Sequence, residues 1–408
     1  MATNNNDKTL NVPHLRFPEF SGEWEEHTLS EYLEFKNGLN PDAKRIGSGL
    51  PFISVMDILS EGVINYDNIR GKVNATEKEI ECFGVKDGDL LFQRSSETLE
   101  DVGRANVYMD NRTAIYGGFV IRGRKIGNYD PLFFKYLLAT PLARKRTCRM
   151  GAGAQHFNIG QEGLSKISLY FPSIEEQRKI AGFLSLIDER IATQNKIIED
   201  LKKLKSAISK YLFARKDLLE TTICLSNIAT LKNGYAFQSG KYNALGKWKI
   251  LTITNVPGER YINDEDCNCI INLPNDIQDH QVLKEGDILI SLTGNVGRVS
   301  LCKNGNYLLN QRVGLLQLAK NVNQEFLYQI LSSQRFENSM IACGQGAAQM
   351  NIGKGDVENY VLPYSSNGNN ILWVAKILHS YDECIINELR RLTLLTMQKQ
   401  YLLTQMFI

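Results

Sequence analysis

Two pairs of short polar loops carry side chains suited to contact with a nucleic acid. In the first pair, residues 93–96 read Gln-Arg-Ser-Ser and residues 291–295 read Ser-Leu-Thr-Gly-Asn. Arginine can hydrogen-bond to guanine or to phosphate, and hydroxyl and amide groups commonly position the backbone. The alternative is that these loops only connect and cap secondary-structure elements. The candidate contacts of this pair, with one arginine downstream of each loop, are Arg94, Ser95, Ser96, Arg104, Thr293, Asn295 and Arg298.

The second pair of loops is rich in glycine and amide side chains. Residues 151–160 read GAGAQHFNIG, and residues 344–353 read GQGAAQMNIG. Amide groups can pair with adenine, and glycine lets the backbone approach a ligand closely. The candidate contacts of this pair are Gln155, His156, Asn158, Gln349 and Asn351.

A basic run precedes the first glycine-rich loop. Residues 143–149 read ARKRTCR, at the end of an expected helix. Cations grouped in this way can contact DNA phosphates, although a solvated helix end is the alternative. The candidate phosphate contacts are Arg144, Lys145, Arg146 and Arg149.

The motifs that catalysis would need are missing from the sequence. An adenine methyltransferase needs an Asn/Asp-Pro-Pro-aromatic loop, and the chain has no Pro-Pro pair. Residues 353–355 lack the spacing of a phosphate-binding loop, and the glycines of 151–153 follow a helix rather than a strand. The five histidines show no metal or triad spacing, and the eight cysteines form no paired C-x-x-C motif. We therefore expect a non-catalytic chain that binds no metal and no cofactor itself.

The candidate loops are positioned by a fold that occurs twice. Four sequence blocks recur in the same order, at displacements between 193 and 198 residues. An ordered repeat of this kind indicates two domains of one fold with loops of different length. The matching blocks begin at Leu29 and Leu225, at Val85 and Leu283, at Asp130 and Asn323, and at Gly151 and Gly344.

Each domain is followed by a long helix with a heptad seam. Apolar residues recur at alternating spacings of three and four from Leu184 to Leu212, and the same seam returns 194 residues later, from Leu378 to Met406. So narrow a seam needs a partner helix, and two copies of equal length in one chain favour pairing of these two helices with each other. Homodimerisation of separate chains through this seam is the alternative. The seam residues are Leu184, Ile187, Ile191, Ile198, Leu201, Leu378, Tyr381, Ile385, Leu392 and Leu395.

Polar residues interrupt the seam at matched places in the two helices. We expect Gln194 against Glu388 and Lys205 against Lys399 to fix the register of the pair.

The predicted fold class is α/β, with two tandem domains, each followed by a long helix, in an internal repeat. The predicted boundaries are 1–174, with a loosely held polar arm at 1–20, then a helix at 175–217, a second domain at 218–373 and a helix at 374–408. No apolar run approaches the ~20 residues of a membrane span, and no signal peptide is recognisable. We therefore expect a cytoplasmic protein.

Several of these motifs together resemble a known family. The segment LRFPEFSGEW, the GDLL block, the segment FPSIEEQRKIAGFLSLID and the duplication resemble the specificity subunit of type I restriction–modification systems. The resemblance runs from Leu15 to Ile408. It departs from the family pattern mainly at 365–370, where the second copy lacks the Glu-Gln pair, so a partner contact made by that pair is in doubt.

The resemblance implies a non-catalytic reader of double-stranded DNA. Two target-recognition domains would each read half of a split site. The two long helices would pack as an antiparallel coiled coil with a pseudo-twofold internal repeat, which would space these domains and dock methyltransferase subunits. S-adenosylmethionine would be bound by the methyltransferase partner, and a translocating endonuclease subunit would join when present. From the residues alone, two alternatives stay open: a single-chain DNA methyltransferase, and a coiled-coil adaptor without DNA recognition.

We predict that the purified chain neither methylates nor cleaves DNA, because no nucleophile, metal cluster or cofactor loop was found. The measurement is incubation of the chain with duplex DNA, magnesium and radiolabelled S-adenosylmethionine, in the absence of other subunits. Label transfer or strand cleavage above that of heat-denatured chain would contradict the prediction.

Overall fold

The computed structural model describes residues 10–153, 156–344 and 350–408. These residues form two compact bodies. The first body contains the described residues up to Asn195 together with Arg391–Ile408, and the second body contains Lys196–Arg390.

The first body is built from short strands and helices. Its strands are β1 (Glu25–Thr28), β2 (Leu33–Asn37), β3 (Ile46–Ile53), β4 (Lys72–Val73), β5 (Gly84–Val85), β6 (Leu90–Gln93), β7 (Ser95–Ser96), β8 (Ala105–Val107), β9 (Ala114–Tyr116), β10 (Val120–Lys125), β11 (Phe157–Asn158) and β12 (Ser168–Phe171). Its short helices are α1 (Val55–Ile58), α2 (Glu77–Phe83), α3 (Pro131–Ala139), α4 (Pro141–Met150) and α5 (Gln161–Ser165).

The second body has the same kind of elements. Its strands are β13 (Thr221–Cys224), β14 (Ala229–Asn233), β15 (Trp248–Leu251), β16 (Asn268–Ile270), β17 (Val282–Leu283), β18 (Ile288–Ser291), β19 (Val299–Leu301), β20 (Tyr307–Leu309), β21 (Val313–Leu318) and β22 (Val361–Tyr364). Its short helices are α7 (Gln324–Leu331), α8 (Gln334–Gly344) and α9 (Lys354–Glu358).

The two bodies share one sheet topology, which confirms the predicted repeat. The strand order β2-β10-β6-β8 of the first body corresponds to β14-β21-β18-β19 of the second, and the order β4-β3-β9-β5 corresponds to β16-β15-β20-β17. In both bodies a further two-stranded antiparallel sheet, β1-β12 or β13-β22, joins the first strand to the last. The β3–β9 and β15–β20 pairs are parallel and most others are antiparallel, so the sheets are mixed.

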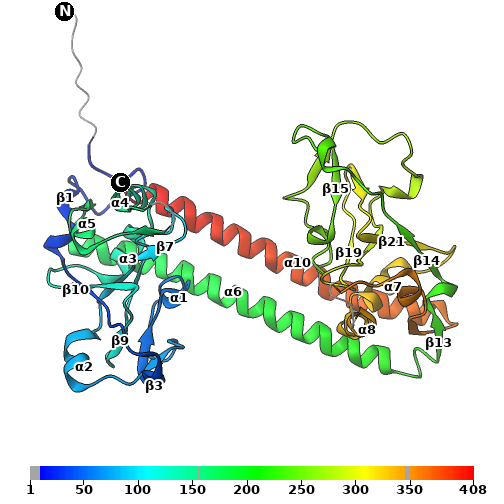
Figure 1. Cartoon of the computed structure of the whole chain (residues 1–408), viewed down its shortest axis with the longest axis horizontal. Coiled ribbons are helices and arrows are strands. Elements are labelled where there is room, and N and C mark those ends of the chain that lie inside the picture. The colour runs from blue at the N-terminus through cyan, green and yellow to red at the C-terminus, as the bar shows by residue number, and fades with distance from the viewer. Residues whose placement is uncertain (1–9, 154–155, 345–349) are drawn as a thin grey trace, which may run out of the picture. The chain divides into compact units, whose positions relative to one another are not determined.

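Two long helices follow the strands of the two repeats (Figure 1). Helix α6 spans Ile174–Ala214, against the predicted 175–217, and α10 spans Gly368–Gln405, against the predicted 374–408. The loop expected at 365–370 therefore ends at Asn367. The side-chain oxygen of Asn367 accepts a hydrogen bond from the N–H of Asn369 at 3.0 Å, so this residue caps the helix and lets it begin earlier than its seam suggested.

Each body contains parts of both long helices. In the first body, Leu184 and Ile187 near the start of α6 share a core with Leu402 and Met406 at the end of α10. In the second body, Leu212 at the end of α6 shares a core with Leu378 near the start of α10. The predicted antiparallel pairing within one chain is therefore confirmed, and every predicted seam residue is buried or partly buried.

Aromatic residues close the core of the first body around the end of α10. The ring of Phe407 lies 5.4 Å from that of Phe133 on α3 and 6.1 Å from that of Trp24, measured between centroids. Large side chains from before β1, from α3 and from the residues directly after α10 thus bury one another. The first body is complete only when the end of the chain is in place.

The described part of the N-terminal arm is held against both long helices, which corrects the expectation of a loosely held arm. The N–H of Leu15 donates to the carbonyl of Gln405, and the guanidinium of Arg16 lies 2.7 Å from the carboxylate of Glu176, which is 1% exposed. The next residue, Gln177, donates to the carbonyl of Pro172 and accepts from the N–H of Asp130. The Glu-Gln pair is therefore used inside the first body.

Two lysine–aspartate pairs join the long helices. The Nζ of Lys399 lies 2.6 Å from Asp188 in the first body, and the Nζ of Lys205 lies 2.6 Å from Asp382 in the second. The lysines are 194 residues apart, as are the aspartates, so the two pairs are copies. This corrects the expectation that Lys205 lies against Lys399, since two ammonium groups repel each other while each lysine here meets a carboxylate. The role proposed for Gln194 against Glu388 stays a prediction.

We predict that Phe407→Ala lowers the free energy of unfolding of the first body by ~3–5 kcal/mol, the usual cost of removing a buried phenyl ring. Hydrogen exchange of amides in β6 and β10 of the full chain measures this, and amides of β18 and β21 should change less. Tyr401→Ala is the matched control, because Tyr401 is an exposed aromatic residue near the end of α10. Equal protection losses in the two variants would contradict the packing described here.

Candidate nucleic-acid interface

The two polar loops of the first body lie side by side. Strand β7 pairs with β11, so that Ser95 lies opposite Asn158 and Ser96 opposite Phe157. The side chains of Ser95 and Asn158 are hydrogen-bonded, and the N–H of Ile159 donates to the carbonyl of Arg94 at 3.0 Å. Loops predicted separately from the sequence therefore form one surface.

The second body repeats this arrangement. Thr293 forms an antiparallel bridge with Asn351, and the N–H of Ile352 donates to the carbonyl of Leu292 at 2.9 Å. The N–H of Gly294 donates to the carbonyl of Met350 at 3.0 Å. Two further candidates, Gln155 and Gln349, lie outside the described residues.

A third loop, which the sequence analysis missed, adjoins each of these surfaces. It connects β9 to β10 in the first body, where the carbonyl of Phe119 accepts from the N–H of Arg94 at 2.9 Å. It connects β20 to β21 in the second body, where the carbonyl of Arg312 accepts from the N–H of Leu292 at 3.0 Å. Each of the two residues directly precedes its strand, so Phe119 and Arg312 occupy equivalent positions.

The third loop is fixed by a matched glycine. A Cβ on Gly38 would lie 2.1 Å from the carbonyl oxygen of Gly117, and a Cβ on Gly234 would lie 2.2 Å from that of Asn310. Only glycine allows so close an approach, which explains why both repeats carry Asn-Gly at the end of the strand. The repeated Asn-Gly pair could therefore have pointed to the third loop. It indicates the backbone that supports this loop, however, and not the exposed residues Phe119 and Arg312.

The exposed residue of the third loop differs between the bodies. The Phe119 side chain is 68% exposed, whereas Arg312 places a cation at the same position. In the described part of the chain, no hydrogen bond or ion pair engages the guanidinium of Arg312. A phenyl ring can contact a thymine methyl group, and an arginine can bond to guanine or to phosphate. The two bodies thus offer different contacts on the same frame.

The candidates of the basic run divide into two kinds. The guanidinium of Arg144 donates to the carbonyls of Glu100 and Val102 at 2.8 and 2.7 Å, and burial lowers its pKa. The guanidinium of Arg146 donates to the carboxylate of Glu26 at 2.7 Å and to Ser168. These contacts hold α4 against β1, β12 and the loop that contains Glu100 and Val102.

The geometry therefore favours a structural role for Arg144 and Arg146. Lys145 and Arg149 are the exposed cations of the run, and their contact with phosphate stays a prediction. Hydrogen bonds from Ser168 and Arg146 lower the pKa of Glu26, with Ser168 the larger cause, so this carboxylate is charged at neutral pH.

The remaining candidates are partly engaged within the protein. Arg104 pairs with Asp101 at 2.7 Å, and Arg298 lies 3.5 Å from Glu337. One Arg94 nitrogen donates weakly to the carbonyl of Gly118 at 3.4 Å. The side chains of His156 and Asn295 belong to exposed residues. None of these contacts buries its arginine completely. The five side chains that a ligand can reach are therefore those of Arg94, Arg104, His156, Asn295 and Arg298.

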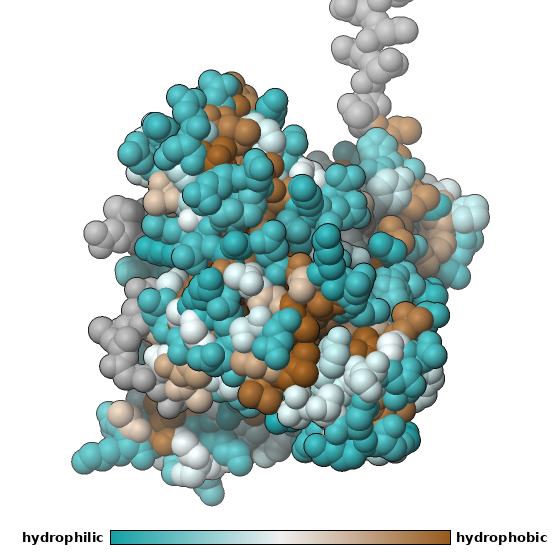
Figure 2. All heavy atoms as spheres, turned by 90° about the vertical axis from the view of Figure 1, so that its right-hand side faces the viewer, coloured by the Kyte–Doolittle hydropathy of each residue, from teal (hydrophilic) through white to brown (hydrophobic). Residues whose placement is uncertain are grey.

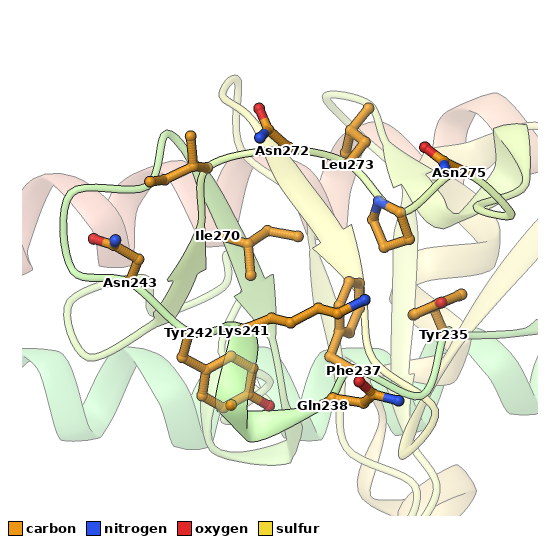
Figure 3. Close-up of a pocket in the computed structure, with 13 residues that line it drawn as sticks. Tyr235, Phe237, Gln238, Lys241, Tyr242, Asn243, Ile270, Asn272, Leu273 and Asn275 are labelled. Atoms are coloured by element: carbon orange, nitrogen blue, oxygen red, sulfur yellow. The ribbon is translucent and has the colours of Figure 1, made fainter.

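The second body also carries a hollow of about 440 Å³ (Figure 3). Tyr235, Phe237 and Tyr242 contribute rings to its lining, and several amide side chains and one lysine surround them. In the first body, Ile80 and Phe83 of α2 pack in the corresponding region against Leu39, the equivalent of Tyr235. The second body therefore exposes aromatic and amide groups where the first is covered. The amide and lysine residues of the lining are Gln238, Lys241, Asn243, Asn272 and Asn275.

The face drawn in Figure 2 is mainly hydrophilic, with smaller apolar areas between polar side chains. Among the described residues no group of three or more His, Cys, Asp or Glu side chains could hold a metal ion. None of the helices formed by these residues is long and apolar enough to cross a membrane.

Known proteins with similar sequences share this plan. A family model described as the type I restriction modification DNA specificity domain matches the chain twice, at residues 21–203 and 220–397. The type I restriction enzyme MjaVIII specificity subunit of Methanocaldococcus jannaschii is 25% identical over 354 residues, which cover 80% of this chain and 78% of that protein. The putative MjaX specificity subunit of the same organism is 24% identical over 377 residues, which cover 87% of this chain and 86% of that protein.

Solved structures show the same fold. The S subunit of a type I restriction–modification system from M. genitalium matches with a TM-score of 0.59 and 17% identity, over 97% of this chain and 99% of that one. A chain from a study of complex assembly and conformational transition in a type I system matches with a TM-score of 0.57 and 14% identity, over 93% of this chain and 96% of that one.

We predict that Arg312→Ala weakens binding of the cognate duplex by ~1–3 kcal/mol, because an exposed arginine beside both polar loops can bond to a base or a phosphate. Fluorescence anisotropy over a range of salt concentrations measures affinity and separates the two contacts, since loss of a phosphate contact reduces the salt slope by about one. Arg335→Ala is the matched control, because Arg335 is an exposed arginine on α8 of the same body. Unchanged affinity in Arg312→Ala would remove the third loop from the interface.

Proposed function

Because this chain belongs to the family of type I restriction modification DNA specificity proteins, we propose that it reads a split DNA site, with one half read by each of its two bodies. It is the specificity subunit of a type I restriction–modification system, and each body contains one target-recognition domain. The reading of one half-site per body is the further step that we propose.

One observation carries this proposal: the same frame presents different side chains in the two bodies. Three loops are brought together by equivalent backbone hydrogen bonds in each body. At the third loop, however, Phe119 stands where the second body has Arg312. A common frame gives both bodies the same docking geometry, and different exposed residues give them different base preferences.

We further propose that catalysis belongs to partner subunits. The sequence lacks the motif of an adenine methyltransferase, so S-adenosylmethionine is expected on a methyltransferase subunit that associates with this chain. A translocating endonuclease subunit would join the same complex when DNA is cut. The proposal also keeps the cytoplasmic location expected from the sequence.

The paired helices supply a surface for the methyltransferase. In the first body, a groove of about 890 Å³ runs between α6 and the end of α10. Leu186 and Leu394 in its lining are 58% and 65% exposed, and Glu189, Arg190 and Arg391 surround them. Apolar side chains exposed within a charged rim are typical of protein–protein interfaces. We therefore assign methyltransferase docking to this groove.

An exchange of loops tests the proposal. Residues 94–104, 117–119 and 156–158 of the first body would be replaced by those of a relative with a different recognition site. We expect only one half of the methylated sequence to change, because the grafted loops lie in one body. The reciprocal graft at 292–298, 310–312 and 350–352 should change only the other half.

The measurement is the methylation pattern of genomic DNA in cells that carry each variant with its methyltransferase subunit. A change in both halves from a single graft would contradict independent reading. Unchanged methylation from both grafts would show that the three loops do not read DNA.

A further inference from the structure

The two Lys–Asp pairs of the long helices have equivalent neighbours in the two bodies. In the first body, the hydroxyl of Tyr136 on α3 donates to Asp188 at 2.8 Å. In the second body, the amide of Gln329 on α7 donates to Asp382 at 2.5 Å. Helices α3 and α7 begin with the same capping hydrogen bond, in which Asp130 or Asn323 accepts from the N–H three residues later. Tyr136 and Gln329 follow these capping residues at the same distance in the sequence, so they occupy the same position. This correspondence allows the rest of the two surroundings to be compared residue by residue.

In the second body, a buried arginine completes the network. Arg260 is 8% exposed on its side chain and lies 2.9 Å from Asp382 and 2.6 Å from Glu325. Its guanidinium also lies 5.1 Å from the ring centroid of Tyr328. Arg260 and Lys205 are thus matched by Asp382 and Glu325, two cations against two carboxylates. Hydrogen bonds from Arg260 and Gln329 lower the pKa of Glu325 and outweigh the opposing effect of its burial.

The first body has different residues at three of these positions. The N–H of Ile64 donates to the carbonyl of Val107, and in the second body the N–H of Ile262 donates to the carbonyl of Leu301, so Ile64 and Ile262 are equivalent. Gly62 and Arg260 each lie two residues earlier, so Gly62 is the equivalent of Arg260. On α3, Leu132 replaces Glu325 and Lys135 replaces Tyr328. The first body therefore lacks the arginine side chain and the second carboxylate, and it gains a lysine.

A pocket of about 660 Å³ lies at this place in the first body. Gly62, Lys135 and Asp188 line it, together with residues from the end of α10. Its size is that of a small-molecule site. The pocket thus coincides with the place that the arginine side chain fills in the second body.

The pocket has more positive than negative charge. Five Lys or Arg residues line the pocket, namely Arg104, Lys135, Arg144, Lys145 and Lys399. Three Asp or Glu residues also line it, namely Glu61, Glu100 and Asp188. Asp188 is already bound by Lys399 and Tyr136. The Nζ of Lys135 has only the backbone carbonyl of Glu61 as a hydrogen-bond acceptor within the described residues. Burial lowers the pKa of Lys135 to about 8, although Asp188 opposes the shift.

A second cation of the pocket is also incompletely satisfied. The Nη1 atom of Arg144 is buried, and no hydrogen-bond partner for it exists among the described residues. The other end of the guanidinium meets only carbonyls and a cysteine. Lys135 and Arg144 are partly buried and have no carboxylate partner among the described residues, so a negatively charged ligand in the pocket would offset their charge.

We propose that this pocket binds a phosphate group. A phosphate carries one to two negative charges and several strong acceptor oxygens, which matches the two cations without carboxylates. The source is a DNA backbone phosphate or a free phosphate ester. Both are compatible with the position of the pocket, since its rim includes Glu100 and Arg104 of the loop that continues from Arg94.

The probe is pyrophosphate, titrated calorimetrically into the full chain at low ionic strength without DNA. Two variants make the pocket less positive in different ways. Lys135→Met removes a cation, and Leu132→Glu places a carboxylate one helical turn from Lys135, where the second body has Glu325. We expect each variant to lose at least about tenfold in pyrophosphate affinity. Lys78→Met, an exposed lysine on α2, is the matched control and should bind like the original chain.

A second readout guards against misfolded variants. In the original chain, bound pyrophosphate should raise the pKa of Lys135 from about 8 toward its ordinary 10.5, measured by NMR on the lysine side-chain carbons. No pyrophosphate binding, or binding that both variants retain, would overturn the proposal. A pKa of Lys135 that stays unchanged at saturation would do the same.

The source of the phosphate is separated with a short cognate duplex. Competition between duplex and pyrophosphate, with a salt slope reduced by about one in Lys135→Met, assigns the pocket to the DNA backbone. Pyrophosphate binding without competition assigns it to a free phosphate ester. A chain that binds pyrophosphate but no duplex would refute the proposed function and leave the phosphate site standing.

Discussion

Completion of each body by both long helices is the constraint on which the rest of this structure depends. The core of the first body includes Leu402, Met406 and Phe407, which follow the second repeat in the sequence. The core of the second body includes Leu212, which belongs to the helix that follows the first repeat. Neither recognition frame can bury its apolar face with its own repeat alone. The loops that would read DNA are therefore held in place by residues far away in the sequence, as Phe407 is from Arg94.

Much of this architecture was predictable because it depends on periodicity. The heptad seam and its return after 194 residues predicted two long helices that pair within the chain, and the family resemblance implied that the pair is antiparallel. The partners of the seam lysines were not predictable in the same way. Displacement within a repeat tells which residues are equivalent, but contact across an antiparallel pair depends on register, and Lys205 meets Asp382 rather than its own equivalent.

The candidate site was predictable in its backbone and less so in its side chains. The second pair of loops was identified because its glycines and amide side chains recur, and recurrence marks a shared frame. Arg144 and Arg146 looked like phosphate contacts in the sequence, yet both turn toward carbonyls and carboxylates of the same body. Phe119 was missed because a single aromatic residue after two glycines carries no pattern, and only the position of the third loop shows its exposure.

The reciprocal ion pairs have a consequence for ancestry. Asp188 and Lys205 lie on one helix and bind Lys399 and Asp382 on the other, so each repeat carries one acidic and one basic member. A half-length polypeptide with a single repeat would already contain everything that the pairing requires. Two copies of it could close the same bonds about a true twofold axis, as an isologous dimer, and would then read a palindrome. Duplication and fusion of such a gene would have freed the two halves to diverge, which turns a symmetric target into an asymmetric one.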